Sequence, residues 1–146
     1  MHENRTDDDY WLRDDTGANV DLLAWPARNA KNLPLKFQPE LPNPVPGEDQ
    51  STWGYPITLQ AYWGNPHSAR SIEMELFSCA VKSIASEHLV PCHFLSPTTA
   101  KFTKLVPPNA YCLIPLTHLK ANTTYSVVAT CPETKVKQTW QFQTGR

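Results

Sequence analysis

Histidine and acidic side chains are the groups in this sequence that most often build metal or catalytic sites. The five histidines are scattered over different segments, and none lies two, three or four positions from another. A metal site would need the fold to assemble its ligands, so solvent-exposed histidines are the simpler interpretation. The oxygen-rich segments 6–9 and 13–17 lack the glutamate spacing of an EF-hand loop, which favours a solvated acidic linker over a calcium site. We expect neither a metal nor a cofactor.

The four cysteines are Cys79, Cys92, Cys112 and Cys131, with no CxxC pair and no zinc-like spacing to histidine. An even number in a short chain favours two disulfides in an oxidising compartment over four buried thiols. Three pairings are open. Cys79 with Cys92 would join neighbouring strands, and Cys112 with Cys131 would close the last third of the chain.

Nucleophilic and phosphate-binding motifs are absent from the sequence. No serine lies in a GxSxG elbow, and the five glycines are isolated, so no glycine-rich phosphate loop exists. A cysteine that is held in a disulfide cannot act as a nucleophile. We therefore expect that the chain is not an enzyme.

Four aromatic residues lie close together in the sequence, Trp53, Tyr55, Tyr62 and Trp63. Exposed aromatic rings on a β surface can stack on sugars, whereas strand alternation buries some of them in a core. Core packing is favoured for Tyr55 and for one of Tyr62 and Trp63, and Trp53 is the residue to test for exposure. Trp53, Tyr62 and Trp63 form the candidate surface for a carbohydrate or peptide.

Length and charge limit the remaining function classes. The 146 residues suit one domain, and a net charge of -1 with a pI near 6.5 provides no basic surface for nucleic acid or an anionic membrane. No run of about 18 apolar residues exists that could span a bilayer. The N-terminus also lacks the basic and apolar regions of a signal peptide, so an exported protein would need a leader from outside this sequence.

The elements that must position these residues are predicted to be short β-strands. The fourteen prolines and the lack of helical periodicity exclude long helices, and short runs rich in β-branched and aromatic residues recur between turn residues. We predict an all-β sandwich of about seven strands in two sheets. The predicted strands are 20–25, 33–37, 57–63, 71–79, 89–95, 111–114, 124–130 and 138–143.

Alternation predicts which side chains face the core. Ile72, Met74 and Leu76 alternate with Glu73 and Glu75. The same pattern predicts that Tyr125, Val127 and Ala129 share one face, and that Trp140 and Phe142 point away from Gln141 and Gln143. Five prolines in residues 31–49 predict an extended strap that turns at Gly47 and lies at a sheet edge or crosses between sheets.

The segment 119–127, LKANTTYSV, resembles the corner found in fibronectin type III domains and related sandwiches. There, a leucine and a turn precede a tyrosine that starts an alternating strand. The resemblance implies that Leu119 and Tyr125 are structural, with the Tyr125 ring in the core and its hydroxyl bonded to nearby backbone.

Four blocks together resemble the Ig-like domain that follows the CAP domain in some bacterial secreted proteins. The blocks are residues 25–49, 53–63 (WGYPITLQAYW), 115–131 and 139–144. The resemblance implies that residues 1–20 are a linker or the tail of a missing upstream domain and that residues 21–146 are the sandwich. It also implies a secreted, periplasmic or cell-surface location. The CAP cleft residues are absent, and the four cysteines depart from the family pattern.

Three functions follow as hypotheses. The first is a non-catalytic accessory, spacer or recognition domain, with the upstream domain of the same polypeptide or another surface protein as its partner. The second is a carbohydrate- or peptide-binding module that uses exposed aromatic residues. The third is a domain that completes the cleft of an upstream CAP-type domain.

Overall fold

A computed structural model describes residues 11–12, 20–39, 45, 47–63, 72–79, 87–97, 109–132 and 137–146. Ten strands lie within these residues, and the one helical element among them is the short 3-10 turn η2, Gln50–Thr52. The prediction of an all-β fold is confirmed. No helix in the described residues is long and apolar enough to cross a membrane.

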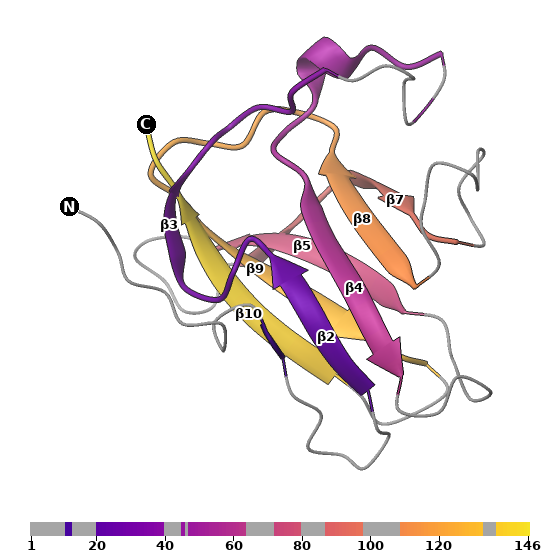
Figure 1. The fold of residues 1–146 in the computed structure, drawn as a ribbon. Helices are drawn as coiled ribbons and strands as arrows, with labels where there is room; N and C mark the ends of the chain where they lie inside the picture. Colours follow the sequence, from indigo (N-terminus) through magenta and orange to yellow (C-terminus); the bar gives the residue numbers. More distant parts are fainter. Residues whose placement is uncertain are drawn as a thin grey trace.

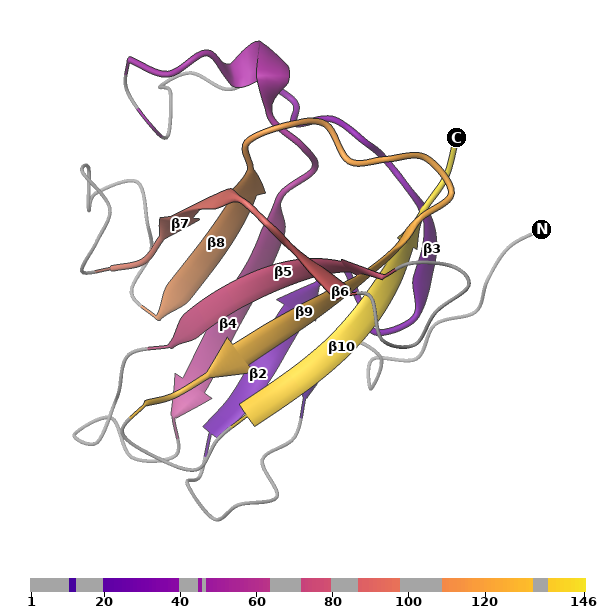
Figure 2. The same ribbon diagram turned by 180° about the vertical axis from the view of Figure 1, so that it is seen from behind.

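The strands form two five-stranded sheets that pack face to face (Figures 1 and 2). In spatial order, the first sheet contains β1 (Trp11–Leu12), β2 (Val20–Trp25), β4 (Ile57–Trp63), β8 (Ala110–Pro115) and β7 (Cys92–Leu95). The second contains β3 (Ala30–Leu33), β10 (Lys137–Thr144), β9 (Thr124–Thr130), β5 (Glu73–Cys79) and β6 (Glu87–Val90). All neighbours are antiparallel except β3 and β10, which run parallel.

The predicted strands 20–25, 57–63 and 124–130 have the same bounds in the structure. The predicted strand 33–37 is wrong, because pairing with β10 places β3 at Ala30–Leu33, a polar stretch in which Asn32 has a φ of 59°. The predicted strand 89–95 is two strands, since Pro91 has no N–H to donate and the chain changes sheets there. Trp11 and Leu12, within the segment predicted as linker, form β1 and pair with β2.

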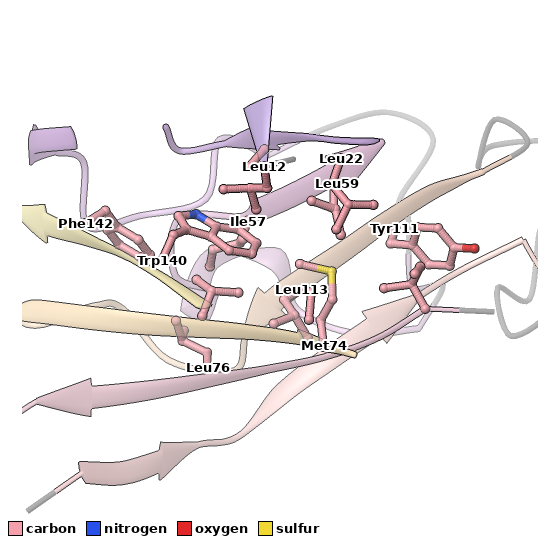
Figure 3. Close-up of a cluster of buried hydrophobic side chains, with 14 of the residues drawn as sticks. Leu12, Leu22, Ile57, Leu59, Met74, Leu76, Tyr111, Leu113, Trp140 and Phe142 are labelled. Carbon is pink, nitrogen blue, oxygen red and sulfur yellow. The ribbon is translucent and has the colours of Figure 1, made fainter. Parts of the chain in front are cut away.

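The core lies between the sheets and follows the predicted alternation (Figure 3). Ile72, Met74 and Leu76 are buried, whereas Glu73 and Glu75 are exposed. The inward residues of β9 and β10 are likewise buried, namely Tyr125, Val127, Ala129, Trp140 and Phe142. The indole Nε1 of Trp140 donates to the carbonyl of Pro26 at 3.0 Å, which satisfies the one polar group of this ring inside the core.

The corner before β9 has the geometry that the sequence predicts. Tyr125 is 2% exposed, and its hydroxyl accepts a hydrogen bond from the backbone N–H of Lys120 at 2.8 Å. Its ring stacks on Phe142 with 5.6 Å between centroids, and Leu119 is buried beside it. Burial raises the pKa of Tyr125, an effect that the bond from Lys120 partly offsets. The hydroxyl therefore holds the turn before β9 against the core.

The Tyr125→Phe variant should lower the free energy of unfolding by about 1 kcal/mol, because the N–H of Lys120 loses its acceptor in a partly buried hydrogen bond. Urea denaturation followed by fluorescence measures the change. Tyr62→Phe removes the same hydroxyl from a half-exposed ring and serves as the matched control, for which we expect a change within about 0.5 kcal/mol. Equal effects of the two substitutions would contradict a structural role for the Tyr125 hydroxyl.

The segment that connects β3 in the second sheet to β4 in the first, residues 34–56, contains the predicted prolines and is called the strap from here on. Its two ends meet where the N–H of Phe37 donates to the carbonyl of Trp53 at 3.0 Å and Lys36 forms a bridge with Gly54. Gly47 has a φ of 87°, as the predicted turn requires, and the N–H of Glu48 donates to the carbonyl of Val45. Residues 40–44 and 46 of the strap lie outside the described residues. Figure 1 shows η2 beyond the ends of β4 and β8.

Candidate functional site: an aromatic face on the first sheet

The outward side of the first sheet carries aromatic side chains on β1, β2 and β4, the side turned toward the viewer in Figure 1. In β2 the side chains of Leu22 and Ala24 are buried, so Trp25 belongs to the outward set, and it is 45% exposed. In β4 Leu59 and Ala61 are buried, and Tyr62 is 50% exposed. We call Trp11, Trp25 and Tyr62, together with Tyr55 just before β4, which bonds to Trp25, the aromatic face.

Trp25 has a fixed orientation at one end of this face. Its indole Nε1 donates a hydrogen bond of 2.8 Å to the hydroxyl of Tyr55. Tyr55 is half-buried and packs against the main core just before β4, so the acceptor is itself anchored. The next residue, Pro26, is tied to the core, because its carbonyl accepts the hydrogen bond from the indole of Trp140. The ring of Trp25 is therefore exposed and held in place.

Tyr62 marks the other end of the aromatic face. Its ring lies 5.3 Å from that of Trp11, with 54° between the ring planes. β1 pairs with β2 so that Trp11 is opposite Leu23, and the inward neighbour Leu12 is buried in the core. Since tilted aromatic contacts are favourable, each of the two rings limits the motion of the other.

Polar side chains lie between the two ends. Thr58, opposite Trp25, is exposed, and Gln60, opposite Leu23, is half-buried. Asp21 is opposite Tyr62 and is also half-buried. The face therefore combines aromatic rings with a hydroxyl, an amide and one carboxylate, and these groups can stack on and hydrogen-bond to a ligand.

Trp53, a member of the candidate ligand surface and the residue to test for exposure, is only 2% exposed. Its ring packs edge-on against Phe37 at 5.1 Å and against His93 at 5.4 Å, in a cluster with Ile114 on the outward side of β7 and β8. Phe37 and Trp53, at the two ends of the strap, thus cover part of the outward side of β7 and β8. Trp53 cannot stack on a ligand while the strap is in place.

Of the other two residues in the predicted ligand surface, Tyr62 lies on the aromatic face, and the side chain of Trp63 lies outside the described part of the structure. Sequence reasoning missed Trp25 and Trp11. Alternation in VDLLAW could have found Trp25, because buried Leu22 and Ala24 place it outward. No comparable signal existed for Trp11, whose strand has two residues.

Cys79, Cys92, Cys112 and Cys131 form no disulfide in the structure, which contradicts the predicted disulfides. Cys79 lies opposite Glu87 at one end of β6 in the second sheet, whereas Cys92 begins β7 in the first sheet, beyond the other end of β6. A disulfide needs Cα atoms within about 7 Å. Cys112 belongs to the cluster on the outward side of the first sheet, whereas Cys131 is buried in the core after β9. The sheets pack about 10 Å apart, which separates the second predicted pair.

The intact mass of the protein should therefore be unchanged by reductant. Burial, with a smaller contribution from Cys112, raises the pKa of Cys92 to about 12, so the thiol remains protonated in the folded protein at pH 8. Its alkylation by iodoacetamide should be at least tenfold slower in the folded than in the unfolded protein, because the thiolate is the reactive form. Peptide mapping after timed labelling measures this rate. Equal rates in both states would contradict the raised pKa.

The raised pKa of Cys92 also predicts how the free energy of unfolding depends on pH. The ordinary pKa of 9.0 applies to the unfolded thiol, and the folded value is higher, so the contribution of Cys92 to stability is complete below pH 9 and is lost as the pH rises from 9 toward 12. A Cys92→Ala variant should show a smaller loss of stability over this range. Urea denaturation at several pH values provides the comparison.

The described residues contain no group of three or more histidine, cysteine or acidic side chains that could hold a metal ion. His118 is placed by a 2.8 Å hydrogen bond between its Nε2 and the carbonyl of Ser51, and His93 by the ring of Trp53. Segments 6–9 and 13–17, considered above for calcium, lie outside the described residues.

Comparison with known proteins gives one structural similarity. No family model matches the chain, and no curated protein matches it. The structure is similar to that of selenomethionine PcoC, a copper resistance protein from Escherichia coli, with a TM-score of 0.45 and 16% identity over 83% of this chain and 94% of that one. This similarity carries no conclusion about the ligand of the present chain, and the CAP-associated context stays a prediction. The described residues themselves form a β-sandwich with the aromatic face on its first sheet.

Proposed function

We propose that this chain is a non-catalytic recognition module of a secreted or cell-surface protein, and that it binds a carbohydrate through the aromatic face. The observation that carries the proposal is the exposure of Trp25 and Tyr62 on one side of an open sheet. Large aromatic residues that stay exposed while their rings are fixed by specific contacts are typical of binding surfaces.

The surroundings of the candidate nucleophiles support a non-catalytic role. Cys92 is kept protonated by its raised pKa, and Cys131 is buried in the core. His118 and His93 contact the strap, where each supports a structural segment. The location outside the cytoplasm rests on the resemblance to the Ig-like domain of secreted proteins.

Carbohydrate is favoured over peptide by the side-chain chemistry of the face. Sugars present apolar C–H faces and hydroxyl edges, which match aromatic rings beside the hydroxyl of Thr58 and the amide of Gln60. A peptide bound as an added strand would instead need a sheet edge, and the aromatic face lies on the flat side of β2 and β4.

A panel of soluble polysaccharides, followed by tryptophan fluorescence and calorimetry, tests the proposal. Binding should be lost in a Trp25→Ala, Tyr62→Ala double variant and retained in Leu89→Ala. Leu89 is a matched control because it is 59% exposed and lies on β6 in the other sheet. A glycan that binds the double variant as tightly as the parent protein would place the site elsewhere, and binding to extended peptides alone would favour peptide recognition.

A further inference from the structure

Provided that the proposed function holds, we propose that the ligand is an uncharged, extended glycan chain that lies along β2 and β4 and contacts Trp25 and Tyr62 with different sugar units. The inference concerns the length, charge and direction of the ligand. It rests on three features of the face, which are the spacing of its rings, its charge and the fixed orientation of its two ends.

The spacing of the rings exceeds the size of one sugar. Trp25 is opposite Thr58, and Tyr62 follows Thr58 by four residues on β4, which corresponds to about 13 Å along the strand. A single sugar cannot reach both positions, whereas a chain that runs parallel to the strands can. An extended chain with flat, repeating apolar faces fits this arrangement better than a coiled one.

The side chains between the rings indicate a neutral ligand. The outward residues of β1, β2 and β4 that the structure describes are Trp11, Asp21, Leu23, Trp25, Thr58, Gln60 and Tyr62. None of these outward residues is a lysine, arginine or histidine, so they offer no cationic side chain to pair with a polyanionic chain. Thr58 and Gln60 point to the same side from alternate positions of β4, so they can hydrogen-bond to successive hydroxyl groups of a neutral chain.

The two ends of the face are fixed before any ligand binds. The hydroxyl of Tyr55 holds the indole of Trp25, and the ring of Trp11 packs on that of Tyr62. Rings that are already oriented lose little conformational freedom on binding, which raises affinity without additional contacts. Tyr55 is therefore a positioning residue, and it acts on the ligand through Trp25.

A length series tests the inference, with β-1,4-linked glucose oligomers from the disaccharide to the hexasaccharide as probes and calorimetry as the readout. Affinity should rise by about tenfold or more between the disaccharide and the hexasaccharide, because only the longer chain contacts both rings. Trp25→Ala and Tyr62→Ala should each abolish this gain. Tyr55→Phe should reduce hexasaccharide affinity by a few-fold, with the secondary structure unchanged by circular dichroism, whereas Leu89→Ala should have no effect.

The outcomes separate the inference from the proposed function. If glycans bind through the two rings but affinity does not depend on length, or if an oligogalacturonate binds more tightly than the neutral oligomer, the inference is wrong and the proposed function stands. If coiled α-1,4-linked oligomers bind as well as the extended series, the proposed direction along the strands is wrong. If no glycan binds the folded protein, both proposals are overturned.

Discussion

Replacement of Trp53 by alanine should lower the free energy of unfolding by about 3 to 5 kcal/mol, the range found for large aromatic side chains removed from a core. Trp53 is almost fully buried and packs against Phe37, His93 and Ile114. The cavity that alanine leaves would lie between the strap and the first sheet. Since domains of this size are stable by only about 5 to 15 kcal/mol, the variant should be marginally folded.

Urea denaturation of Trp53→Ala measures this loss, with Trp25→Ala as the matched control. Both substitutions remove one indole, but the ring of Trp25 is 45% exposed and lacks surrounding core, so we expect a cost of about 1 kcal/mol or less. Limited proteolysis should also cut the Trp53→Ala variant within residues 38–52, because the ring contacts hold the strap. A Trp53→Ala variant no less stable than Trp25→Ala would contradict the role of the strap cluster.

The contrast between these two tryptophans shows what could be predicted from the sequence. The alternation of apolar and polar residues along the strands was sufficient to predict the core. Successive side chains of a strand point to opposite faces, so a sheet with one buried and one solvent-exposed face has apolar residues at every second position. Tyr125 could also be placed, since its position relative to Leu119 belongs to a local corner that repeats in related folds. These features depend on residues that are near one another in the chain.

Trp53 and the cysteines could not be placed in this way. The position of Trp53 depends on Phe37 at the other end of the strap and on β7 and β8, which are far away in the sequence. The cysteine pairing likewise depends on which strand belongs to which sheet, and the change of sheet at Pro91 separates Cys79 from Cys92. The aromatic face was found only in part, because Trp11 and Trp25 come together with Tyr62 through the pairing of β1, β2 and β4.

Gly54 connects the strap to the aromatic face, and a Gly54→Ala substitution should disturb both. A Cβ atom at this position would lie 2.6 Å from the carbonyl oxygen of Thr117 and 2.8 Å from the Cβ atom of Pro115. Neither backbone segment can move easily, since the N–H of Gly54 donates to the carbonyl of Pro115 at 2.9 Å. We expect the free energy of unfolding to fall by about 3 kcal/mol, at the upper end of the range for overpacking.

Gly47→Ala is the control for the backbone effect alone. A Cβ atom at Gly47 would meet nothing within 4 Å, but the φ of 87° strains any other residue, so a cost of about 1 to 2 kcal/mol is expected. The two variants should differ more clearly in binding. Gly54 precedes Tyr55, whose hydroxyl orients Trp25, so a displaced backbone at Gly54 should weaken glycan binding, whereas Gly47→Ala should not. Calorimetry at a temperature where both variants are folded makes the comparison, and equal affinity in the two would show that the strap and the aromatic face are independent.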